Sequence, residues 1–104
     1  MDIKQIDLEA KLFKGFADKS RLLILTTILK EPKTVTEIVK EIGLSQPNTS
    51  SHLSCLLECG LINKEKKGRE VFYEVRSKEV NNIIREGQKI LKKHSKEIYN
   101  CLSY

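Results

Sequence analysis

The sequence predicts a mostly α-helical fold with one β-hairpin, in the arrangement called a winged helix-turn-helix. A helix-turn-helix is predicted at about residues 34–59, because two helical segments meet at a tight turn containing Gly43. A hairpin, or wing, is predicted at about residues 61–76, because apolar and polar residues alternate beside Gly68. A long amphipathic helix is predicted at about residues 77–101. The chain has 104 residues, and we expect residues 1–104 to form a single domain.

Two further helices are predicted before the helix-turn-helix. Apolar residues recur at helical spacing over residues 3–16, which indicates an amphipathic helix. Asp18 is a plausible N-cap for a second helix at about residues 19–30, which Pro32 prevents from continuing. This second helix is apolar on nearly all sides, so we expect it to be buried at the centre of the domain.

Local signals also place the ends of the two helices in the helix-turn-helix. Thr34 and Glu37 match a capping box, and Gly43 is suited to ending the helix that they begin. Ser45 is a good N-cap for the next helix, and Gly60 is suited to the position just after it. The second helix of such a pair is the one that enters the DNA major groove.

The charge of the chain favours a nucleic-acid partner. The formal net charge is +5, and the whole excess of Lys and Arg over Asp and Glu lies after residue 62. Lys66, Lys67 and Arg69 lie at the tip of the predicted wing, where they are expected to contact DNA phosphates or a minor groove. The sequence shows neither a signal peptide nor an apolar run long enough to span a membrane, so we expect a cytoplasmic protein without a membrane partner.

The three cysteines are candidates for a metal site. Cys55 and Cys59 are four residues apart in a predicted helix, so they share a face, and Cys101 lies near the C-terminus. In a cytoplasmic protein, thiols are more often ligands or sensors than structural disulfides. Three thiolates suit a soft ion such as Cd²⁺ or Pb²⁺, whereas Zn²⁺ prefers four ligands and is less favoured. Cu⁺ and trivalent arsenic also bind sulfur, so the residues alone leave the ion open.

Several segments together resemble the ArsR/SmtB family. They are the stretch Leu-Ser-Gln-Pro-Asn-Thr-Ser-Ser-His-Leu-Ser-Cys-Leu at 44–56, Gly-Leu-Ile at 60–62, Gly-Arg-Glu-Val-Phe-Tyr at 68–73 and Phe-Ala-Asp-Lys-Ser-Arg-Leu-Leu-Ile-Leu at 16–25. The resemblance covers nearly the whole chain. It implies a homodimer, joined through the first and last helices, that represses metal-resistance or efflux genes and releases double-stranded operator DNA on binding metal.

The resemblance also implies roles for particular residues. The segment His-Leu-Ser-Cys-Leu-Leu-Glu-Cys-Gly-Leu at 52–61, with Cys101, resembles the CmtR-type cadmium/lead sensors, which implies Cys55, Cys59 and Cys101 as ligands. A different site of the family, in the last helix, is not expected here, because Asn81 and Ile83 cannot replace two of its ligands. The residues expected to contact DNA from the recognition helix are Ser45, Gln46, Asn48, Thr49, Ser51 and His52.

Two other functions compete with metal-responsive repression. A repressor of the same fold that senses oxidants or persulfide would use Cys55 and Cys59, although a disulfide at this spacing in a helix would be strained. A metal-buffering thiol protein would leave the helix-turn-helix without a role. His52 and Cys55 share a helix face, but no orienting residue or oxyanion site accompanies them, so we do not expect an enzyme.

Overall fold

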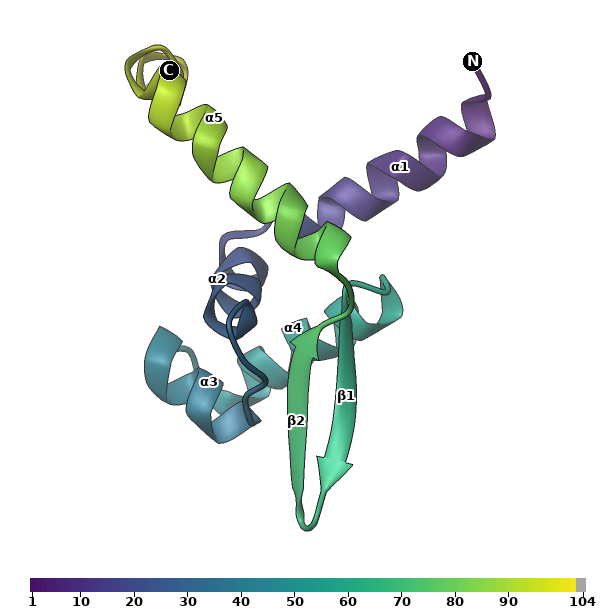
Figure 1. Cartoon of the computed structure of the whole chain (residues 1–104), viewed down its shortest axis with the longest axis vertical. Coiled ribbons are helices and arrows are strands. Elements are labelled where there is room, and N and C mark those ends of the chain that lie inside the picture. Colours follow the sequence, from purple (N-terminus) through teal and green to yellow (C-terminus); the bar gives the residue numbers. More distant parts are fainter. Residues whose placement is uncertain (103–104) are drawn as a thin grey trace.

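The computed structural model describes residues 1–102, and the side chains of residues 1–97. It confirms the predicted fold: a group of helices carries a two-stranded antiparallel hairpin that projects from it (Figure 1). The elements, in chain order, are α1 (Ile3–Phe16), α2 (Lys19–Ile28), α3 (Val35–Ile42), α4 (Gln46–Glu58), β1 (Ile62–Lys67), β2 (Glu70–Val75) and α5 (Lys78–Leu102).

The helix ends follow the predicted local signals. The Asp18 carboxylate accepts a hydrogen bond from the backbone N–H of Arg21 at 3.1 Å and so caps α2. Thr34 and Glu37 form both hydrogen bonds of a capping box at the start of α3. Gly43 then ends α3 with a φ of +75°, in the left-handed region that glycine adopts without strain. The turn between α3 and α4 is therefore encoded locally.

The core lies where α2, α3 and α4 meet the base of the hairpin and the start of α5. Its buried apolar residues are Ile24, Leu25, Ile28, Ile38, Leu53, Leu56, Leu61, Ile62, Val80 and Ile84. Helix α2 ends at Ile28, close to the predicted end at about residue 30. The expectation that it is buried on nearly all sides was wrong, because Leu22 and Leu23 are 41% and 40% exposed.

A polar network connects the helix-turn-helix to the wing. The Glu41 carboxylate, near the end of α3, accepts hydrogen bonds from Lys33 Nζ at 2.5 Å and from Thr27 Oγ1 at 2.6 Å. Both bonds stabilise the ionised form and lower the pKa of Glu41, with the Lys33 contact the larger cause. The backbone of Lys33 also pairs with Tyr73 of β2 through two hydrogen bonds of 2.8 and 3.0 Å. The orientations of α3 and the hairpin are thus set together.

Helices α1 and α5 extend from the core as two diverging arms, and the hairpin points the opposite way (Figure 1). Helix α5 changes direction at His94, whose φ of −125° and ψ of 27° are not helical. Apolar side chains remain exposed on both arms, including Phe13 at 54% and Leu91 at 51%. Within residues 1–102, none of the helices combines the length and the apolar character needed to cross a membrane.

Candidate DNA-reading helix and thiol site

The first turn of α4 presents polar side chains to solvent. Ser45 caps the helix by accepting a hydrogen bond from the Asn48 N–H at 3.2 Å, and Pro47 occupies the first turn, where it has no N–H to lose. This leaves the side chains of Gln46 and Asn48 exposed and without a hydrogen-bond role in the cap. Both can form paired hydrogen bonds to adenine in a major groove. Ser51 is also exposed on this helix.

Thr49 does not belong to this exposed surface. Its side chain is fully buried, and its hydroxyl donates to the carbonyl oxygen of Ser45 at 2.8 Å. A side chain that packs in the core in this way does not reach a DNA base. Of the six residues that we expected at the DNA, the structure therefore places Thr49 in the core, beside Leu53 and Leu56 on the buried face of α4.

His52 is partly buried and faces the start of α2. Its Nδ1 lies 4.0 Å from the Asp18 carboxylate, and its side chain is 21% exposed. The pKa of Asp18 is lowered, mainly by the hydrogen bond from the Arg21 N–H and further by the His52 charge. His52 therefore lies where α4 meets α2, between the exposed polar turn and the two cysteines. This contact could not be predicted from the sequence, because His52 and Asp18 are far apart in the chain and Asp18 already has a local role as a helix cap.

The hairpin register separates the predicted basic residues of the wing. Lys66 pairs with Val71, and Lys67 pairs with Glu70, so the two lysines project from opposite faces. Lys67 Nζ lies 5.8 Å from the centre of the Phe72 ring, in range of a cation–π contact. Arg69 follows Gly68, which adopts a φ of +64° in the turn. The tip is basic, but one DNA strand cannot contact all three side chains in the same way.

The Cys55 and Cys59 thiols lie one turn apart at the end of α4. Both are free and partly buried, and the Cys59 N–H donates to the Cys55 carbonyl oxygen at 3.0 Å. Burial raises the pKa of the Cys59 thiol, and the charge of the neighbouring Cys55 and a hydrogen bond with its side chain add to the rise. Two free thiols four residues apart on one helix face are a suitable pair of ligands for a soft ion.

The end of α1 approaches Cys59 closely at Gly15. A Cβ atom added to Gly15 would lie 2.6 Å from Leu61 Cδ1 and 3.8 Å from Cys59 Cβ, so the absence of a side chain allows the contact. Arg21 fixes the end of α1, because Nε donates to the Gly15 carbonyl oxygen at 3.2 Å and an Nη donates to the Lys14 carbonyl oxygen at 2.8 Å. We did not predict these roles of Gly15 and Arg21, because both residues are far from the cysteines in the sequence.

The third predicted ligand is not positioned. Cys101 belongs to the last turn of α5, but its side chain lies outside the described residues. Within the described side chains, no three His, Cys, Asp or Glu residues are grouped closely enough to hold a metal ion. His94 and Glu97 approach to 3.6 Å on exposed positions of α5. The structure therefore supplies a thiol pair, to which a third ligand has to be added.

Comparisons with known proteins agree with this architecture. Residues 18–64 match the family described as bacterial regulatory protein, ArsR family. The chain is 37% identical over 78 residues to a "probable mercury resistance operon repressor" of Streptomyces lividans, covering 75% of this chain and 62% of that protein. It is 36% identical over 75 residues to the arsenical resistance operon repressor of Bacillus subtilis, covering 71% of each. It is 38% identical over 64 residues to the regulator CmtR of Mycobacterium tuberculosis, covering 62% of this chain and 54% of CmtR.

Solved structures show the same fold. The structure of HlyU from Vibrio cholerae has a TM-score of 0.78 at 32% identity and covers 86% of this chain and 97% of that one. A homodimeric winged helix-turn-helix DNA-binding domain from Mycobacterium bovis has a TM-score of 0.83 at 22% identity, covering 90% and 87%. The second likeness concerns the fold alone.

Proposed function

Because this chain belongs to the ArsR family of DNA-binding transcriptional regulators, we propose that it is a homodimeric repressor that a soft metal ion releases from its operator. The observation that carries the proposal is the division of α4 into two parts. Its first turn exposes Gln46 and Asn48, whereas its last turn holds Cys55 and Cys59. Occupation of the thiols thus acts on the helix that reads DNA.

In the proposed complex, the exposed turn of α4 enters the major groove and the wing lies along the DNA backbone. Gln46 and Asn48 read bases, while Ser45 and Ser51 are available to bases or phosphates. His52 faces α2 and is 21% exposed, so it reaches the DNA only with the exposed edge of its ring. Lys66, Lys67 and Arg69 neutralise phosphates from the wing. The Glu41 network supports this arrangement, because it holds α3 and β2 in a fixed relation.

Substitution of Gln46 by alanine is expected to weaken operator binding by about 1–3 kcal/mol and to relax specificity at one base pair. The reason is loss of a paired hydrogen bond to a base from an exposed side chain. Fluorescence anisotropy against a panel of operators with single base-pair changes measures both effects.

The matched control for this experiment is Thr49→Val, three residues further along the same helix. Thr49 is buried away from the DNA-facing surface, so this variant is expected to keep its operator affinity within about twofold. Loss of the hydroxyl's hydrogen bond to the Ser45 carbonyl oxygen should instead lower folding stability, by about 0.5–1.5 kcal/mol. An equal loss of affinity for every operator in the Gln46 variant would assign that residue to phosphate. If the Thr49 variant lost discrimination at one base pair, the buried face of α4, and not the exposed one, would determine base recognition.

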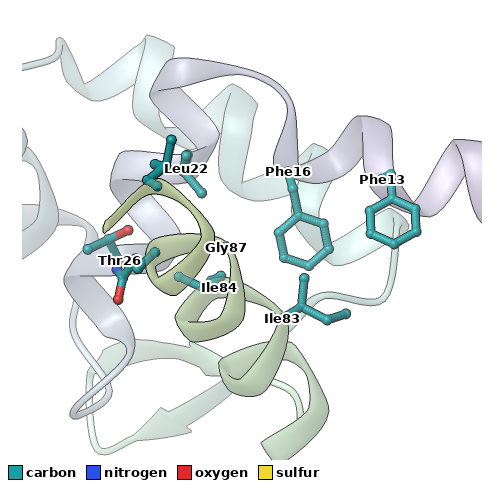
Figure 2. Close-up of a pocket in the computed structure, with 9 residues that line it drawn as sticks. Phe13, Phe16, Leu22, Thr26, Ile83, Ile84 and Gly87 are labelled. Atoms are coloured by element: carbon teal, nitrogen blue, oxygen red, sulfur yellow. The ribbon is translucent and has the colours of Figure 1, made fainter. Parts of the chain in front are cut away.

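The proposed dimer uses an apolar groove between α1, α2 and α5. The groove has a volume of about 270 Å³, and Figure 2 shows Phe13 and Phe16 of α1 facing Ile83 and Ile84 of α5 across it. Leu22, which we had expected to be buried, also lines this groove. A second copy would cover these side chains, and two-fold symmetry would place two recognition helices about 34–36 Å apart, one turn of DNA.

Substitution of Phe13 by glutamate is expected to weaken dimerisation by at least about tenfold, because a charge would be buried at the interface. Folding should be retained, since Phe13 is 54% exposed in the protomer. Sedimentation equilibrium measures the dimer constant. The control is Asn82→Glu, which adds the same charge at an exposed position of α5 outside the groove. If the Phe13→Glu variant remained fully dimeric, this groove would not be the dimer interface.

The proposed effector site consists of Cys55 and Cys59 with Cys101, and the proposed ions are Cd²⁺ or Pb²⁺, with Zn²⁺ less favoured. The named relatives include a mercury and an arsenical resistance repressor, which supports a soft ion of some kind. When bound, such an ion supplies a bridge between thiolates. Titration of Cd²⁺ into the reduced protein, followed by thiolate-to-metal charge-transfer absorption, tests the site. A stoichiometry of one ion per protomer is expected.

Metal binding by Cys55 and Cys59 disfavours the DNA-bound state in two ways. A tether from the end of α4 shifts the reading helix in its groove, and the thiolates add negative charge near DNA phosphate. The coupling expected for such a switch is about 1–3 kcal/mol, and it is reciprocal, so operator DNA must weaken metal binding by the same factor.

One alternative retains the same fold and uses the same thiols. Cys55 and Cys59 are free thiols one helical turn apart, so an oxidant or persulfide could act on them instead of a metal. Release of the operator by oxidant in metal-free buffer, with no response to Cd²⁺ under reducing conditions, would favour this alternative.

A further inference from the structure

Helix α1 is attached to the rest of the described protomer near its C-terminal end. Residues 1–11 are all exposed, and within the described part of the chain Gly15 is the one buried residue of α1. Leu12 and Phe16, near the same end of the helix, pack partly against the core. Figure 1 shows the other turns of α1 extending away from the core as an arm. The direction of this arm is therefore set by the contacts at its C-terminal end.

Arg21, in the first turn of α2, donates to two carbonyl oxygens in the last turn of α1. Its Nε lies 3.2 Å from the Gly15 oxygen, and an Nη lies 2.8 Å from the Lys14 oxygen. A planar guanidinium donates in fixed directions, so this pair of hydrogen bonds sets an orientation as well as a distance. Positive charge is also favourable at the C-terminal end of a helix, where carbonyl oxygens have no partner within the helix. We call residues 14–21 the joint between α1 and α2.

Helix α2 and the reading helix α4 belong to one core. The buried apolar residues that the two helices contribute to it are Ile24, Leu25, Ile28, Leu53 and Leu56. A close-packed core transmits strain and is hardly compressible, so α2 and α4 behave as one body. The end of α1 also meets this body at Gly15, where an added Cβ atom would lie 2.6 Å from Leu61 Cδ1. The joint thus connects the arm to the body that carries the DNA-reading turn.

A small change of angle at the joint has a large effect at the far end of α1. The helix has 14 residues, so it is about 21 Å long at about 1.5 Å per residue. A tilt of about 10° at one end moves the other end by roughly 3.5 Å, which is about the rise of one base pair along DNA. Because the proposed dimer is formed through α1, such a movement changes the distance between the two reading helices by a similar amount.

We propose that Arg21 is a positioning residue, which fixes the angle between α1 and α4 and so sets the spacing of the operator half-sites that the dimer accepts. This inference rests on the proposed function, because it requires a dimer formed through α1 and two half-sites read by two copies of α4. Base contacts define the sequence of each half-site, whereas the joint defines the distance between the half-sites.

The test measures binding of the 104-residue protein to duplexes that carry two inverted half-sites. The half-site sequence is the one that wild type selects from a randomised DNA pool, and the spacing is changed by one or two base pairs in both directions. Wild type is expected to lose at least about tenfold in affinity for each change of one base pair. Arg21→Gln is expected to lose about threefold or less, because its arm is no longer held at one angle. Arg21→Lys keeps the charge and can donate to one carbonyl oxygen, so an intermediate loss is expected.

The control variant is Lys19→Gln, which removes an exposed positive charge from the same turn of α2 and is expected to behave as wild type. Each variant is also measured on a duplex with a single half-site. Affinity for this duplex should stay within about twofold of wild type, because the reading turn of α4 is unchanged.

Two results would overturn this inference alone. One is wild-type selectivity for spacing in Arg21→Gln. The other is an equal loss of affinity for every duplex in this variant, since it would indicate a general loss of stability. A wild-type protein that is monomeric, or that binds two half-sites no more tightly than one, would overturn the proposed function as well.

Discussion

Replacement of Cys59 by serine is expected to weaken Cd²⁺ binding by more than about a hundredfold and to abolish release of the operator by Cd²⁺. Loss of an outer-shell partner alone typically costs about 10–100-fold in metal affinity, so loss of a thiolate ligand is expected to cost more. Cys59 is the C-cap of α4, at the opposite end from the exposed turn that carries Gln46. Operator affinity of the metal-free variant should therefore remain within about twofold of wild type.

Charge-transfer absorption and operator anisotropy, recorded on the same samples, separate the two effects. Ser54→Ala is a suitable control, because Ser54 is exposed on the same helix, one residue before Cys55. Cys101→Ser is expected to weaken the same absorption band, which assigns the third ligand. If Cys59→Ser still released the operator at the Cd²⁺ concentration that acts on wild type, the thiol pair would not be the sensor.

Helix ends could be predicted from the sequence because they depend on neighbouring residues. Asp18, Thr34 and Ser45 each accept a hydrogen bond from an N–H three residues later, so a short stretch of sequence contains both partners. The exposure of α2 could not be predicted in the same way. The sequence of an apolar helix does not reveal which side packs in the core of the protomer. Leu22 lines the groove that we propose a second copy covers.

The candidate site was predictable in composition but not in orientation. Thr49 and Asn48 are adjacent polar residues, and only the packing of α4 against the core decides that Thr49 is buried and Asn48 exposed. The opposite directions of Lys66 and Lys67 depend on the hairpin register. The approach of Gly15 to Cys59 joins residues more than forty positions apart, a relation that spacing along the chain does not contain.

Metal binding by Cys59 is expected to depend strongly on pH. A thiol is protonated at neutral pH even at its ordinary pKa, and burial raises the pKa of Cys59 further, so an ion that binds to it must displace a proton. Cd²⁺ affinity is therefore expected to rise with pH and to fall as the solution becomes more acidic. Each displaced proton contributes about one log unit of affinity per pH unit, so three thiols set a limit of about three.

Competition titrations at several values between about pH 6 and pH 7.5 measure this slope. Cys59→Ser should lower the slope by about one log unit per pH unit, because one fewer proton is displaced. Arsenite serves as the control, since its binding releases water instead of protons and its affinity should stay constant over the same range. An unchanged slope in Cys59→Ser would mean that the Cys59 proton is not displaced, and Cys59 would then not be a ligand.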